Sequence, residues 1–193
     1  MRKVRNYPRE IKSSFLSCEK DFETIITTLF ENSGTFSEDL KRLLVINTKD
    51  CLDDYDNEIY NKKLEEMTTT KMLDEGFIVI KPLKEQFEHD SENSFIFISF
   101  DKFLPGYENS YFRSHHIMID ILCPINQWEL GNYRLRPFKI AGIIDGLLNQ
   151  TKLSGIGLLN FIGSTEIKIN NDMAGYCLIY ETINADDDTT SLE

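Results

Sequence analysis

The stretch Tyr133-Arg-Leu-Arg-Pro-Phe-Lys-Ile-Ala-Gly-Ile-Ile-Asp-Gly-Leu-Leu-Asn-Gln150 decides the fold of this chain. Pro137 suits the first turn of a helix, where its missing N–H costs no hydrogen bond. A helix with a single apolar stripe, placed between segments that predict strands, is expected to lie across one face of a sheet. The stripe has the spacing of one helical face and consists of Ile140, Ile143, Ile144, Leu147 and Leu148.

Strand signals flank this helix on both sides. The longest covers residues 111–123, where Ile117, Ile119 and Ile121 alternate with His116, Met118, Asp120 and Leu122. Residues 94–100 are apolar at nearly every position, which predicts a strand covered on both faces or placed at an interface. Further strands are predicted at 77–80, at 158–163 and 164–170 with a glycine bulge or turn between them, and at 175–184.

The N-terminal part of the chain predicts helices. Residues 19–32 carry an apolar stripe, and Gly34 supplies a stop. Residues 37–46 predict a second helix with Ser37 as N-cap, although the β-branched end at 44–46 also fits a short strand. Residues 47–74 form a polar insertion with a polar helix near 54–67. The insertion contains an aspartate cluster, Asp50, Asp53, Asp54 and Asp56. This cluster indicates a solvated acidic surface rather than a calcium loop, because the glycine and terminal glutamate of such a loop are absent.

The expected fold class is therefore α+β, with a mostly antiparallel sheet and an N-terminal and a central helix packed on one face. We expect one domain over residues 17–184, preceded by a flexible basic arm at 1–16, for which docking on a partner subunit is an equal alternative. An acidic tail at 185–193 is expected to be disordered on its own.

Composition restricts the function classes. The chain has 193 residues with 21 basic and 32 acidic side chains, a net charge of −11. That balance is a poor match for a sequence-specific DNA-binding protein, which normally carries a basic face. The four cysteines are scattered, and two of them, Cys123 and Cys177, lie in predicted strands and are expected to be buried free thiols. No apolar run approaches the ~18 residues of a membrane span, so we expect a soluble protein made in the cytoplasm.

The search for chemistry finds few candidates. His115 and His116 point to opposite faces of a strand and are not expected to share a metal ion, and no metal or cofactor is predicted. Asp120 with Glu166 and Lys168 follows the pattern of metal-dependent nucleases, in which two carboxylates hold Mg²⁺ and a lysine assists water. The same spacing also arises from simple alternation on a strand's polar face.

The candidates for a subunit interface lie around the start of the central helix and in the apolar strand. Arginine and tryptophan are enriched at interfaces, although a tryptophan closing the sheet's end and solvated arginines explain them equally well. Gly142 and Gly146 allow close approach to the helix by the sheet beneath or by a neighbouring subunit. The expected interface residues are Phe95, Phe97, Trp128, Arg134, Arg136 and Phe138.

Three features of the sequence carry a resemblance: Ile-Met-Ile-Asp-Ile-Leu-Cys-Pro at 117–124, Trp128, and Leu-Arg-Pro-Phe-Lys-Ile-Ala at 135–141. In these features the chain resembles the tail-terminator, or tail-completion, proteins of tailed bacteriophages. It is similar in particular to the neck-ring proteins of crAss-like phages. The resemblance covers residues 76–184 and carries no catalytic motif. The insertion at 47–74 and the acidic tail depart from the smaller members.

The resemblance implies a virion structural protein that forms a ring of six or twelve copies in the neck or tail. Such a ring would contact portal, neck or tail-tube proteins, cap the tail tube and surround genomic DNA without reading its sequence. A negative ring lets DNA pass without adhering. Two other functions stay open from the residues: a Mg²⁺-dependent nuclease, and a non-virion binding module that uses the exposed strand.

Overall fold

The computed structural model describes residues 14–32, 34–53, 55–80, 92–105, 112–153 and 156–185. Two predicted segments fall outside these ranges in large part: residues 1–13 of the basic arm and residues 186–193 of the acidic tail. Residues 14–16, predicted as part of the arm, belong to a helix.

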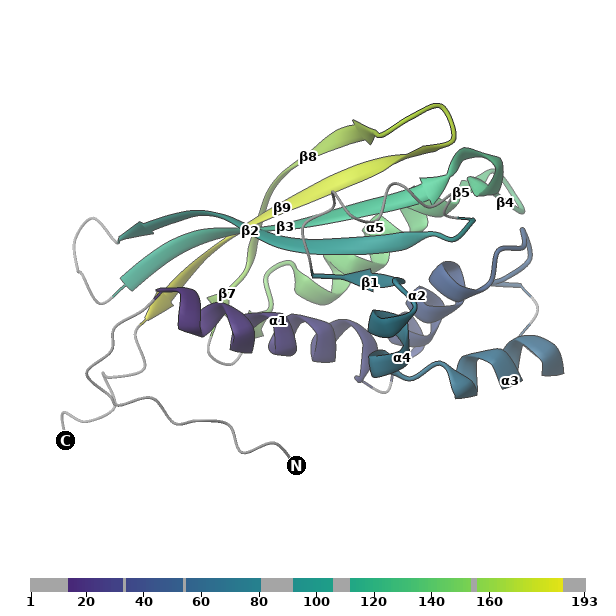
Figure 1. Ribbon diagram of the computed structural model, residues 1–193, viewed down its shortest axis with the longest axis horizontal. Helices are drawn as coiled ribbons and strands as arrows, with labels where there is room; N and C mark the ends of the chain where they lie inside the picture. The colour runs from purple at the N-terminus through teal and green to yellow at the C-terminus, as the bar shows by residue number, and fades with distance from the viewer. Residues whose placement is uncertain are drawn as a thin grey trace.

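A five-stranded sheet forms one layer of the molecule, in the order β1-β2-β3-β9-β8 (Figure 1). The central pair, β3 and β9, matches residue for residue from one end to the other. All neighbours are antiparallel except β1 and β2. The prediction of a mostly antiparallel α+β sheet is confirmed. The strands are β1 Ile78–Val79, β2 Phe95–Pro105, β3 Phe112–Pro124, β8 Asn160–Lys168 and β9 Met173–Ala185.

Helices form the second layer. The long helix α1 (Ser14–Phe30), α2 (Thr35–Val45) and α5 (Arg136–Leu148) pack on one face of the sheet, and α3 (Glu58–Glu66) and α4 (Thr69–Asp74) lie beside α2 and β1 (Figure 1). The prediction of an N-terminal and a central helix on one face is confirmed.

Short elements complete the connections at both ends of α5. Before it, a 3-10 turn at Ile125–Gln127 leads into a hairpin of β4 (Glu129–Leu130) and β5 (Arg134–Leu135). After it, β6 (Lys152–Leu153) pairs with β7 (Gly157–Leu158).

The core lies between the sheet and the three packed helices. Ile117, Ile119 and Ile121 of β3 are completely buried, as the alternation predicted. On α5, Ile140, Ile144 and Leu148 are completely buried and Ile143 is 3% exposed, so the stripe that decides the fold faces the sheet. Burial of one such side chain stabilises the fold by about 1.5–3 kcal/mol.

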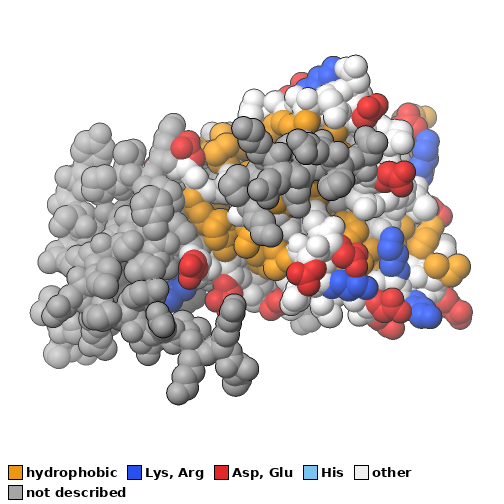
Figure 2. Space-filling view, viewed as in Figure 1, with side chains coloured by type: hydrophobic (Ala, Val, Ile, Leu, Met, Phe, Trp, Pro, Cys, Tyr) orange, Lys and Arg blue, Asp and Glu red, His pale blue; other side chains and the backbone are white. Residues whose placement is uncertain are grey.

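The opposite face of the sheet carries a second, smaller apolar cluster. Leu122 is completely buried there, and Phe95 and Met173 are each 6% exposed. Figure 2 shows hydrophobic side chains gathered over the strands and charged ones over the region of α3 and α4. The strand at 94–100 is thus apolar because both of its faces pack: Ile96 and Ile98 join the main core, and Phe95 joins the outer cluster.

One glycine is required by the packing of two strands. A Cβ at Gly175 would lie 1.7 Å from the carbonyl oxygen of Ile121 on the neighbouring strand. No side chain fits at that distance, so only glycine allows β3 and β9 to pair here.

Two helix boundaries differ from the prediction. α1 begins at Ser14 instead of residue 19 and ends at Phe30, before Gly34. Gly34 is instead the N-cap of α2, because its carbonyl accepts the first helical bonds from Ser37 N–H at 3.1 Å and Glu38 N–H at 3.2 Å. Ser37 as N-cap is therefore wrong. The alternative of a strand at 44–46 is also wrong, since α2 runs through Val45.

The insertion and the late strands also differ in detail. The polar helix predicted at 54–67 is shorter, because Asn57 caps α3 by accepting hydrogen bonds from the backbone of Ile59 and Tyr60. The additional helix α4 buries Met72 in the main core. The two strands predicted at 158–170 are one strand, β8, with a bulge at Phe161/Gly163. The bulge is confirmed and the turn is not.

Candidate subunit contact

Trp128 lies where the sheet meets the start of α5. Its indole N–H donates to the carbonyl oxygen of Cys123 at 3.2 Å, and its ring lies 6.5 Å from that of Tyr176. The ring of Phe138, on the first turn of α5, lies 4.8 Å from that of Tyr176, and Phe138 is 53% exposed. Trp128 therefore closes the end of the sheet, and Phe138 presents an aromatic surface to the outside.

Arg136 is completely buried, so the interpretation of both arginines as solvated is wrong. Its Nη1 donates to the carbonyl oxygens of Leu43 at 2.5 Å and Ile46 at 2.8 Å. Its Nη2 donates to Thr48 O at 2.7 Å and its Nε to Gln127 O at 3.0 Å. The carbonyls of Leu43, Ile46 and Thr48 lie at the C-terminal end of α2 and beyond it, where helix carbonyls lack partners and the dipole favours a cation. Arg136 therefore offers no surface to a neighbour in this conformation.

Arg134 is held at the surface instead. Its Nη2 contacts both carboxylate oxygens of Asp53, at 2.8 and 2.5 Å, and its Nε donates to Gly131 O at 2.8 Å. The hydrogen bond that Arg134 donates to Asp53 raises the pKa of Arg134. Asp53 belongs to the aspartate group predicted as a solvated acidic surface, and this pair fixes it to the β4–β5 hairpin.

The tip of that hairpin exposes an aromatic ring on an unusual backbone. Asn132 and Tyr133 have φ of 60° and 61°, a left-handed pair that glycine and asparagine adopt far more readily than tyrosine. Tyr133 is fully exposed. A strained aromatic residue without contacts of its own points to a contact outside the chain. We call the exposed group at this end of α5 the aromatic tip: Ile125, Tyr133 and Phe138.

A second exposed apolar group lies beyond the other end of α5. Leu158, Phe161 and Ile162 are 45%, 39% and 47% exposed, and we call them the β8 patch. The side chain of Asn149, the C-cap of α5, accepts a hydrogen bond from Phe161 N–H at 3.1 Å and fixes the patch to the helix end. β8 is also an edge strand in the described part of the sheet. The sequence prediction missed this patch, although three large apolar residues in a turn-rich segment were a usable signal.

Phe95 and Phe97, predicted at the interface, occupy the outer face of the sheet. Phe95 is 6% exposed within the outer cluster, and Phe97 is half-buried against it. Gly142 and Gly146 are exposed, and a Cβ on either would meet nothing within 4 Å. They therefore do not serve close packing on the sheet, and their contact with a neighbouring subunit stays a prediction.

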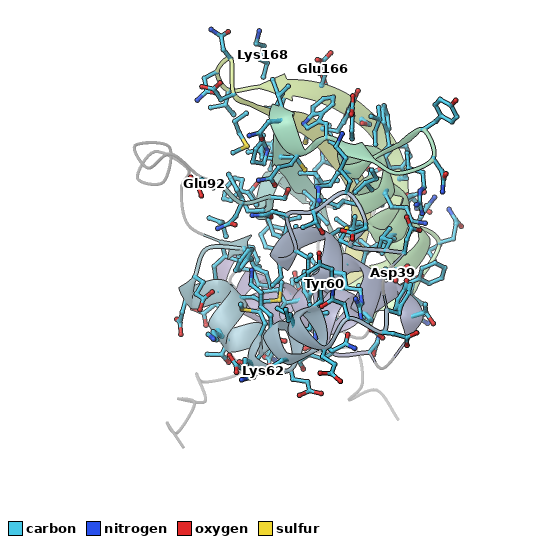
Figure 3. All side chains as sticks on the ribbon, turned by 90° about the vertical axis from the view of Figure 1, so that its right-hand side faces the viewer. Asp39, Tyr60, Lys62, Glu92, Glu166 and Lys168 are labelled. Carbon is cyan, nitrogen blue, oxygen red and sulfur yellow. The ribbon has the colours of Figure 1, made fainter. Side chains whose placement is uncertain are left out.

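The three residues of the nuclease pattern are not brought together. Glu166 pairs with Tyr176, and Tyr176 pairs with Ile121, so Glu166 lies on the core-facing side of the sheet. Asp120 points to the opposite side. Figure 3 shows Glu166 and Lys168 at the outer end of β8. These side chains cannot share one metal ion, and the nuclease hypothesis built on them is wrong.

Other titratable groups are also poorly placed for catalysis. Burial raises the pKa of Asp120, whose Oδ1 has no hydrogen-bond partner. Cys51, Cys123 and Cys177 are buried free thiols, as predicted for Cys123 and Cys177, and burial raises the pKa of Cys123 to about 11. Within the described ranges, no three His, Cys, Asp or Glu residues are grouped as metal ligands. No helix among the same residues is long and apolar enough to cross a membrane.

Comparison with known proteins gives two findings. The family model YomW matches residues 37–182. A chain in the solved virion of a native gene transfer agent particle is similar at 12% identity, over 65% of this chain and 90% of that chain, with a TM-score of 0.42. A likeness of this size does not establish a shared fold. No curated protein matches the chain.

Proposed function

The chain belongs to the YomW family, a phage-associated family, and from this premise we propose that it is a structural protein of a tailed-phage particle. In this proposal, each copy contacts the next through a different surface, and the copies form a ring in the neck or tail. The ring connects the phage head to the tail and caps the tail tube around the DNA channel. The resemblance of residues 117–141 to tail-terminator and neck-ring proteins supports this location.

The observation that carries the proposal is the pair of exposed apolar groups at opposite ends of α5. A contact between two different patches is heterologous: each copy uses one patch for the neighbour ahead and the other for the neighbour behind. Such contacts form a ring when the rotation between copies closes. The aromatic tip and the β8 patch, on opposite ends of one rigid helix of 13 residues, have this arrangement.

The two patches also have the composition of a contact. Aromatic side chains dominate the energy of protein interfaces, and an arginine at their margin adds directed hydrogen bonds. Tyr133 and Phe138 provide the rings and Arg134 the margin on one side. Phe161 and Ile162 on an edge strand provide the other, where the neighbour's backbone can also pair.

The test is a pair of complementary variants. Phe138→Ser removes a ring from the aromatic tip, and Phe161→Ser removes one from the β8 patch. Each variant alone is expected to remain monomeric in native mass spectrometry, whereas an equimolar mixture forms dimers, because each variant keeps one intact patch. Ile80→Ser, at an apolar residue just after β1 that is 42% exposed, is the matched control and should assemble like the unchanged chain.

Assembly of both single variants into rings would contradict the head-to-tail contact. A location in the particle is tested separately: purified virions should contain the protein at a fixed copy number. Its absence from particles that carry the neighbouring neck proteins would instead favour the non-virion binding module.

A further inference from the structure

An open hollow of about 1130 Å³ lies between the C-terminal end of α1, the first half of α2 and the helices α3 and α4. It lies in the helical layer, away from both patches of the proposed ring contact. Figure 3 shows part of this layer, where Asp39 of α2 and Tyr60 of α3 lie well apart from Glu166 and Lys168 on the sheet. Its walls include Phe30, Thr35, Leu64 and Thr69.

Two buried polar side chains in its lining each have one atom without a hydrogen-bond partner. Arg42 is 1% exposed, with Nε on Glu38 at 3.2 Å and Nη2 on Asn61 at 2.5 Å, but its Nη1 bonds nothing. Ser37, 3% exposed, has a hydroxyl without a partner. An unsatisfied buried donor costs about 1–3 kcal/mol, so such groups in one hollow point to a ligand that supplies acceptor oxygens.

The lining also carries acidic side chains. Glu31, Glu38 and Glu65 line the hollow together with Lys41, and Glu38 forms an ion pair with Arg42, which leaves two glutamates against one lysine. A small anion fits such carboxylates badly. A peptide with basic side chains fits both features, because its backbone carbonyls accept from buried donors while its cations meet the glutamates.

The chain itself contains such a peptide. Residues 1–13 hold five basic side chains and one acidic one, although the whole chain is strongly acidic. They also include Val4, Tyr7 and Ile11, which suit the exposed Phe36 and Ile59 on α2 and α3. We propose that the hollow between α1, α2 and α3 binds the basic arm, residues 1–13, of a second copy of this chain.

The geometry of α1 favours a second copy over the same chain. The arm joins α1 at Ser14, whereas the hollow begins at Phe30, the other end of a helix of 17 residues. At 1.5 Å per residue the two points are about 24 Å apart, so an arm running back along α1 would use about seven of its thirteen residues before reaching its own hollow. An extended arm of this length spans about 43 Å, enough to reach an adjacent copy. This step rests on the proposed self-assembly.

Entry of the arm requires one movement. The Tyr55 ring covers the guanidinium of Arg42 at 4.6 Å from its centroid, and the Tyr55 hydroxyl donates to Asp39 at 2.5 Å. Tyr55 is 41% exposed, so it can turn outward into solvent. Its departure frees the face of Arg42 and makes Nη1 accessible to a peptide carbonyl.

The test uses the full chain with Tyr7 replaced by the photo-cross-linker p-benzoylphenylalanine. Half of the copies carry ¹⁵N, so mass spectrometry distinguishes cross-links between copies from those within one. Cross-links between copies to peptides spanning 31–42 and 55–70 are expected. Links only within one copy, or to other surfaces, would overturn the inference.

Charge reversal provides the matched comparison. Glu31→Lys with Glu65→Lys is expected to lower the cross-link yield about tenfold, from two lost ion pairs and the repulsion that replaces them. Glu23→Lys, on the exposed surface of α1, should leave it unchanged. If rings form but cross-links to the hollow are absent, this inference fails and the proposed function stands. If the copies do not assemble at all, both fail.

Discussion

Arg134 and Arg136 lie two residues apart at the start of α5 and are held in opposite ways. Arg134 is at the surface and contacts a carboxylate with two short bonds. Arg136 is completely buried and donates to four backbone carbonyls, with no carboxylate hydrogen-bonded to it among the described residues. The first connects a loop to a hairpin, and the second connects the end of one core helix to the beginning of another.

The difference teaches where a cation contributes to stability. At the surface, water screens the pair and both side chains lose freedom, so the net gain is about 0–1 kcal/mol. In the core, removal of the cation leaves several carbonyls buried without donors, which is far more costly than the net value of making the bonds. The sequence motif is the same, Arg-x-Arg, but the environment decides the role.

The largest effect is expected for Arg136→Met, which keeps the length of the side chain and removes its donors. The free energy of unfolding should fall by about 3–5 kcal/mol, because four buried carbonyls lose their partner. Urea denaturation followed by circular dichroism measures this. A loss below about 1 kcal/mol would mean that water replaces the guanidinium and that the contrast with Arg134 is false.

Asp120→Asn tests a buried charge that, unlike Arg136, has an oxygen without a partner. Burial raises the pKa of Asp120 above its usual value, so the native state favours the protonated carboxyl. The unchanged chain should therefore keep this stability in acid and lose it as pH rises through the native pKa. The variant should be more stable by about 1 kcal/mol at pH 7 and show a flatter profile. Denaturation from pH 4 to 7 checks this, with the exposed Asp101→Asn as control.

The substitution Tyr133→Gly, in the hairpin that contains Arg134, should change the stability of the monomer and its assembly in opposite directions. Glycine adopts the positive φ of this position without strain, so the monomer should gain up to about 1 kcal/mol. Loss of the exposed ring should at the same time weaken assembly. Thermal unfolding and native mass spectrometry measure the two effects. A variant that is stabilised and still assembles normally would remove Tyr133 from the contact.

Arg134→Met should change stability least. The expected loss is about 0–1 kcal/mol, and a double-mutant cycle with Asp53→Asn should show coupling that falls as salt rises from about 0.05 to 0.5 M. The matched comparison is Arg136→Met, the same substitution two residues later in the chain. Equal losses at the two positions would show that exposure does not distinguish the arginines.

Periodicity predicted the architecture because the core is built from regular patterns. The stripe Ile140, Ile144 and Leu148 and the alternation of Ile117 and Ile119 both face the single core between the two layers. Boundaries were less certain because caps depend on backbone geometry: Gly34, predicted as a helix stop, instead begins the next helix.

The candidate site was predicted only in part. Trp128, Arg134 and Phe138 were correctly singled out as neighbours around the start of α5, but their role as an interface stays a prediction. Nothing local separates Arg136 from Arg134, because burial of Arg136 depends on carbonyls about ninety residues earlier in the chain. The β8 patch also depends on the fold, since its exposure follows from its place at the sheet edge.

The unpaired edge of β8 has a consequence for the life of the free subunit. Until a neighbour covers it, an edge strand with Phe161 and Ile162 exposed is a template for indiscriminate strand pairing. The chain's net charge of −11 opposes such encounters by mutual repulsion. Growth would then begin slowly from isolated copies and faster on an existing surface that orients them. The exposed apolar edge of β8 and the negative net charge would thus together determine the rate of assembly as well as its geometry.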